Sequence, residues 1–164
     1  MGDLAPERAI ERYREALAQY DALAAQSYPF RPEEFREELA IARRLGLAQF
    51  GRQDYLSALA TFSRGLQIAE RVNDRALVAA AHLYIAEALA HNGAASTSLA
   101  SFRKALDGFA SLAGVSLPTP GLSPAEHEKA LAEIAAAAPP DLRKSMEFDL
   151  AAFTRLRGRI AGDP

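Results

Sequence analysis

The three histidines are the residues of this chain that come closest to metal or acid–base chemistry. His82 and His91 are nine positions apart (91 − 82), so they do not share a turn of a helix. His127 stands between two glutamates, but it lacks the His-Glu-x-x-His spacing that places two zinc ligands on one helical face. We therefore expect isolated surface histidines and no metal site.

Motifs for covalent catalysis and phosphate binding are absent from the sequence as well. It contains neither a Gly-x-Ser-x-Gly elbow nor a glycine-rich phosphate loop. A small basic cluster of Arg155, Arg157 and Arg159 would favour an anionic partner, although cations are common in the last turn of a helix. We expect a protein that is not an enzyme and that carries no cofactor.

The composition predicts an all-helical domain in the cytoplasm. The 164 residues suffice for a hydrophobic core, and 49% hydrophobic against 24% charged residues favours folding over disorder. Alanine and leucine dominate, and no stretch alternates with a period of two. The net charge of −2 gives no general attraction to nucleic acid or acidic membranes. The absence of cysteine, of an apolar N-terminal segment and of a membrane-spanning run agrees with a cytoplasmic location.

Apolar residues that recur at intervals of three and four predict about seven helices. Prolines, glycines and Asn-Asp pairs mark the breaks between them, and residues 114–122 form a longer linker. The expected helices span 4–25, 32–50, 54–71, 75–91, 95–113, 123–138 and 141–159.

The stretch from Leu45 to Leu66 has the pattern of two helices that pack closely around a tight turn. Gly46 and Ala58 are small, so two antiparallel helices can approach each other there, and Phe62 fills the space beside them. Asp54 is placed to cap the second helix by accepting a hydrogen bond from its free N–H groups.

The same order of residues returns 40 positions later (102 − 62), in the stretch from Ile85 to Leu106. Gly93 occupies the turn, and Phe102 is the equivalent aromatic residue. Ala94 stands where an aspartate caps the earlier helix, so we expect a looser turn. Recurrence of this whole order resembles the tetratricopeptide repeat family, in the longer repeat form found in bacterial regulators.

This resemblance implies a single domain that folds as a right-handed α-solenoid of antiparallel helix pairs. Residues 1–28 would be a lone second helix, and 32–113 would be two core repeats. After the linker at 114–122, residues 123–160 would form a diverged repeat or a pair of capping helices, with Phe148 as the aromatic residue of that repeat.

The resemblance also implies a concave groove, which in the family is lined by first helices and holds extended peptides. Arg43 and Arg44 would form charge-assisted bonds with an acidic or amphipathic segment, and Phe50 and Tyr84 would be apolar shelves. Alternatively, the arginines are only solvated and the aromatic residues belong to the core or are bound intramolecularly. The candidate groove residues are Arg43, Arg44, Leu47, Phe50, Leu83, Tyr84, Glu87 and His91.

These expectations favour a non-catalytic scaffold or adaptor for a protein or peptide partner. The alternative is a regulatory sensor that binds a signalling peptide or a small ligand and acts through a partner chain. The lone N-terminal helix carries Tyr13 and Tyr20, with Phe30 nearby, and an exposed stripe there would pair with another copy of the chain as a homodimer, or with another protein. If the stripe packs on the helix at 32–50 instead, it is the cap of the domain.

Overall fold

The computed structural model of the protein describes residues 4–116 and 124–158, which contain seven helices and no strand. The all-helical prediction is therefore confirmed, and every described helix end lies within one residue of its expected position. Among these helices none is long and apolar enough to cross a membrane. The helices are α1 (Leu4–Ala25), α2 (Pro32–Gly51), α3 (Tyr55–Arg71), α4 (Arg75–His91), α5 (Ala95–Ala113), α6 (Pro124–Ala137) and α7 (Pro140–Gly158).

Some sequence predictions concern positions outside the described residues. They include most of the linker at 114–122, the helix start at Ser123 and Arg159. The side chains described are those of 7–116, 129–147, 149 and 151. The structure therefore leaves the roles of His127, Phe148, Arg155 and Arg157 as predictions.

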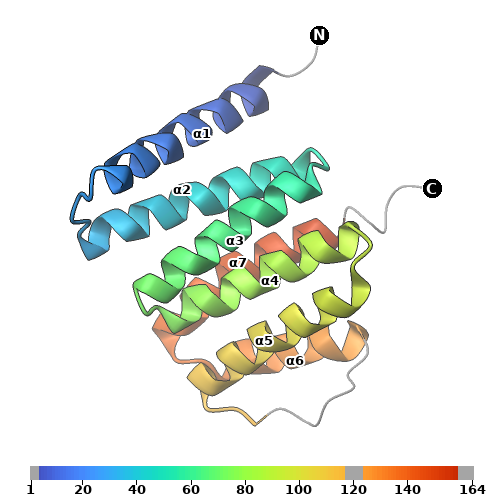
Figure 1. Cartoon of the computed structure of the whole chain (residues 1–164). Coiled ribbons are helices and arrows are strands. Elements are labelled where there is room, and N and C mark those ends of the chain that lie inside the picture. Colours follow the sequence, from blue (N-terminus) through green and yellow to red (C-terminus); the bar gives the residue numbers. More distant parts are fainter. Residues whose placement is uncertain (1–3, 117–123, 159–164) are drawn as a thin grey trace.

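The helices α1 to α5 lie beside one another in chain order, and α6 and α7 fold back against α5 and α4 (Figure 1). The main hydrophobic core is shared by all helices from α2 through α7, because each of them contributes buried apolar side chains to it. Representative core residues, one from each of α3 to α7, are Phe62, Leu83, Phe102, Ile134 and Met146.

Aspartate side chains cap two of the helices at the expected turns. Asp54 accepts a hydrogen bond from the backbone N–H of Ser57 at 3.2 Å, at the start of α3. Asp74 accepts hydrogen bonds from the N–H groups of the first turn of α4. At the start of α5, by contrast, Ala94 provides no side-chain cap, as its residue type requires. The two capped turns fix where α3 and α4 begin, and so fix which residues of each helix face its neighbours.

The close approach of α2 and α3 that the sequence predicts is present at Gly46. A Cβ atom added there would lie 2.4 Å from Cε1 of Phe62, which is far inside van der Waals contact. The phenyl ring has little freedom to move, because it stacks on Tyr84 of α4 with the ring centroids 5.1 Å apart. At Gly65, in contrast, the nearest atom to an added Cβ is a methyl group of Leu39 at 3.4 Å.

The variants Gly46→Ala and Gly65→Ala are expected to change stability in opposite directions. Gly46→Ala forces α2 away from Phe62, so it should lower the free energy of unfolding by about 1–3 kcal/mol. Gly65→Ala gains helix propensity without a clash and should raise it by up to about 1 kcal/mol. Urea unfolding followed by circular dichroism measures both, and equal effects of the two variants would contradict the close contact.

The N-terminal helix α1 packs on α2 through a small core of its own. Ile10 and Leu17 are buried against Ala42 and Leu45 of α2, and Tyr13 packs at their edge. Part of the apolar stripe of α1 is therefore covered within the chain, as the capping interpretation expects. Pairing with another copy through the rest of α1 stays a prediction.

Candidate functional site

The predicted groove face of α2 and α4 meets α7 at a buried carboxylate. Asp149 of α7 is only 2% exposed. Its Oδ1 atom lies 3.3 Å from Nη1 of Arg43 on α2, and it accepts a short hydrogen bond from the hydroxyl of Tyr84 on α4. A single carboxylate thus ties α7 to both helices of the face.

Burial and the two polar partners act on Asp149 in opposite directions. Its pKa is raised above the ordinary value, because burial disfavours the charged carboxylate. The hydrogen bond from Tyr84 and the positive charge of Arg43 counteract this effect but do not cancel it. A buried pair of this kind contributes little net stability, so we interpret the contact as one that fixes the position of α7.

Apolar side chains of α7 complete its contact with the face. Met146 is fully buried in the main core, and Leu142 packs against that core. These two residues and Asp149 follow the spacing of four and three (146 − 142 and 149 − 146), so they lie on one side of the helix. The helix therefore presents an apolar stripe in which one position is a carboxylate.

Three of the six remaining predicted groove residues are buried in this conformation. Leu83 and Glu87 are buried, and Leu47 is half-buried against the core. Phe50 is buried and makes an edge contact with the ring of His91, with centroids 4.9 Å apart. Of the eight predicted residues, only Arg44 is exposed.

The structure thus matches the alternative in which the aromatic residues belong to the core or are bound intramolecularly. Phe50 is a core residue, and the hydroxyl of Tyr84 is bound by α7. The sequence predicts an open groove from α2 and α4 alone. In the structure, α7 covers that face at Arg43 and Tyr84. Binding of a partner at this face stays a prediction.

His82 and His91 are half-buried, whereas the sequence predicts surface histidines. The pKa of His82 is lowered, chiefly because burial disfavours the charged imidazole and secondly because Lys104 is near. The Nε2 atom of His91 is buried and lies 4.0 Å from a carboxylate oxygen of Glu87. In the described ranges no group of three or more metal-ligating side chains could hold an ion.

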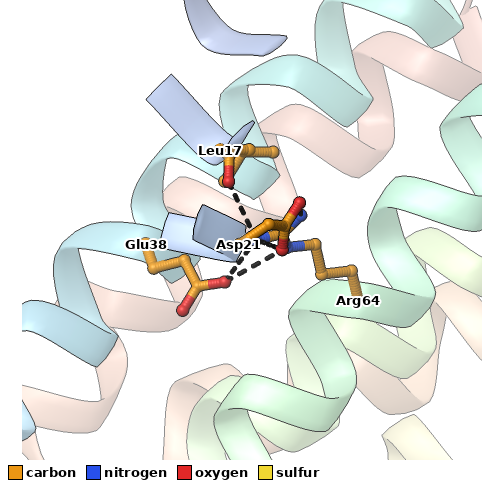
Figure 2. Close-up of polar contacts among 4 residues, drawn as sticks. All are labelled: Leu17, Asp21, Glu38 and Arg64. Carbon is orange, nitrogen blue, oxygen red and sulfur yellow. Dashed lines mark hydrogen bonds and ion pairs between the residues drawn. The ribbon is translucent and has the colours of Figure 1, made fainter. Parts of the chain in front are cut away.

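A second polar cluster, which is partly buried, joins α1, α2 and α3 at Arg64 (Figure 2). The guanidinium of Arg64 donates to Oε1 of Glu38 on α2, at 3.1 Å from Nε and 2.7 Å from Nη2. It also donates to Asp21 at 3.0 Å and to the carbonyl oxygen of Leu17 at 3.3 Å, both on α1. Arg64 thus connects α3 to the two helices that precede it.

The sequence interpretation missed Asp149, Glu38 and Arg64. The signal for the first two was present, since each acidic residue stands at helical spacing from apolar residues and so falls within a buried stripe. A charged residue in such a stripe requires a partner when buried. The identity of that partner depends on which helices meet, and the local pattern does not contain this information.

Removal of Arg64 is expected to leave the buried carboxylate of Glu38 without a cation. Arg64→Met should lower the free energy of unfolding by about 2–3 kcal/mol, because Glu38 is only 7% exposed. The double variant Arg64→Met/Glu38→Leu should recover most of that loss, because no buried charge remains. Asp21→Asn is the control, since Asp21 is exposed and its pair with Arg64 should contribute less than about 1 kcal/mol. A loss of unfolding free energy in the double variant that equals the sum of the losses in Arg64→Met and Glu38→Leu alone would contradict this coupling.

The stabilising effect of Asp149 is expected to fall as the pH rises. Its pKa in the folded protein is above the ordinary value of 3.8, so the folded state binds the proton more tightly than the unfolded chain does. The free energy of unfolding of the wild type minus that of Asp149→Asn should therefore decrease from pH 3.8 upward, until the folded-state pKa is passed.

Urea unfolding of both proteins across this pH range measures that difference. Glu147→Gln, which removes an exposed carboxylate from the same helix, is the control for the loss of one negative charge. A difference that increases with pH would show that the pair with Arg43 outweighs the cost of burial.

Comparison of the chain with protein families, curated proteins and solved structures found no match.

Proposed function

We propose that this chain is a non-catalytic protein-binding module of the tetratricopeptide type, in which the face of α2 and α4 receives a helical segment that carries a carboxylate. In the absence of a partner, α7 occupies this face. The observation that carries the proposal is the buried Asp149, whose carboxylate is held jointly by Arg43 and Tyr84.

The packing of the two helix pairs supports the finer assignment to a tetratricopeptide-like solenoid. In each pair the small residue of the first helix contacts the second helix at short range. In the first pair Gly46 lies against Phe62, and in the second the hydroxyl of Ser98 donates to the backbone oxygen of Ala86 at 2.7 Å. Ala86 is the counterpart of Gly46 at an offset of 40 (86 − 46), so both pairs have a small residue at the close contact.

The chemistry of α7 defines the kind of partner. A competing segment needs an apolar side chain at the position of Met146 and a carboxylate three residues later, so that Arg43 and Tyr84 keep their acceptor. Helix-in-groove recognition of this type uses anchors at intervals of three and four. An adaptor that exchanges α7 for such a helix meets these requirements.

A peptide that corresponds to residues 139–158 is expected to bind the protein in trans once the resident helix is weakened. Met146→Glu in the full chain places a charge in the core contact of α7, and should release it from the face. Fluorescence anisotropy of the labelled wild-type peptide should show at least about tenfold tighter binding to this variant than to the wild-type chain, in which α7 competes.

Matched peptides separate specific from general binding. A peptide with Asp149→Lys should lose binding at least about tenfold, whereas one with Glu147→Lys, the same change at an exposed position, should bind as the parent does. Arg43→Met in the weakened chain should reduce binding, and Arg44→Met should not. If the Met146→Glu chain keeps its helical circular dichroism yet binds both peptides equally or neither, the proposal is wrong.

A further inference from the structure

A cavity of about 350 Å³ lies between α1, α2 and α3, beside the Arg64 cluster. This cavity is separate from the face that α7 covers. Glu38 lines the cavity and precedes Arg43 by five positions, so the two side chains point about 140° apart around α2. Its volume falls in the range of about 300–1,000 Å³ that is typical of small-molecule sites. An apolar crevice beside Arg43 offers about 20 Å³, which is room for one water molecule.

Aromatic rings form one wall of this cavity. Phe30, from the connection between α1 and α2, stacks on Tyr20 with ring centroids 5.8 Å apart and contacts Phe35 at 5.3 Å. All three rings are half-buried, so they present apolar surface that is already ordered. Planar apolar molecules gain most from such a wall, because ring faces and edges offer stacking geometry as well as buried area.

One cation at the cavity lacks a partner within the described part of the chain. Arg71, in the last turn of α3, lines the cavity, is exposed and forms no ion pair with any described residue. The other cation, Arg64, already donates to Glu38, Asp21 and a backbone oxygen. Arg71 is therefore the group that can bind an anionic substituent of a ligand. A guanidinium binds a carboxylate by donating two parallel hydrogen bonds to it.

The remaining charges of the cavity limit how negative that ligand can be. Glu38 and Asp21 are at the same site, so a dianionic group would be repelled by two carboxylates while only one cation is unpaired. Tyr20 adds no charge, since burial and the neighbouring Glu37 raise its pKa to about 12. A single negative charge matches the site.

From this arrangement we infer that the cavity binds a small planar aromatic monocarboxylate, with its ring against Phe30 and Phe35 and its carboxylate on Arg71. The ligand contacts α1, the α1–α2 connection, α2 and α3 together, so its binding energy would hold the N-terminal helix in place. The cavity would be the ligand site of the regulatory sensor that the sequence offers as the alternative function. This inference does not depend on partner binding at the α7 face.

The test uses 2-naphthoate with the full chain. The protein contains no tryptophan, so the naphthyl group can be excited at wavelengths that its five tyrosines do not absorb and its emission titrated. We expect saturable binding, with an affinity at least about tenfold higher than for the neutral 2-naphthamide, because only the acid can pair with Arg71. The dianionic 2-naphthyl phosphate should bind more weakly than the carboxylate.

Three variants locate the site. Arg71→Met should lower the affinity for 2-naphthoate to that for the amide, while Arg36→Met removes an exposed arginine outside the cavity and should have no effect. Ala24→Phe, at an exposed lining position, should block binding of both compounds by filling the space. Absence of saturable binding at millimolar 2-naphthoate, tighter binding of the phosphate, or an unchanged affinity in Arg71→Met would each overturn the inference.

Discussion

A closed ring of four contacts depends on the absence of a side chain at Gly46. Because α2 and α3 touch there, Phe62 lies where it can stack on Tyr84, and Tyr84 in turn donates its hydroxyl to Asp149. Asp149 pairs with Arg43, which is three positions before Gly46 on the same side of α2. The chain of contacts thus leaves α2, passes through α3, α4 and α7, and returns to α2. A change in helix spacing at Gly46 would therefore alter the position of the Asp149 carboxylate relative to its partners.

Both polar clusters connect helices that are not joined by a single turn. Arg64 connects α3 to α1 across α2, and Asp149 connects α7 to α2 and α4. Neighbouring helices are also fixed by their short turns and apolar stripes, as α2 and α3 are in addition to the pair of Arg64 with Glu38. Helices that are distant in the chain have no short turn to fix their relative position, and apolar packing alone allows one helix to slide along the other. A buried charge that must meet one particular partner selects a single register.

What the sequence predicted and what it did not predict follow the same division. Helix bounds, the caps at Asp54 and Asp74 and the contact at Gly46 depend on residues close in the chain, whose spacing carries the information. The pairing of Arg43 with Asp149 spans 106 positions, and no local pattern encodes it. The groove was inferred from residues of α2 and α4 alone, so its occupation by α7 could not be foreseen. Two of the candidate residues, Arg43 and Tyr84, contact Asp149 of that helix.

The position of α7 on α4 also has a consequence for the order of events during synthesis. The residues of α2 and α4 leave the ribosome before those of α7, so the face with Arg43 and Tyr84 forms while its later occupant is still being made. In that interval the nascent chain exposes a guanidinium, a phenol and apolar surface that the finished protein covers. A partner or chaperone that acts co-translationally would meet this face without having to compete with α7.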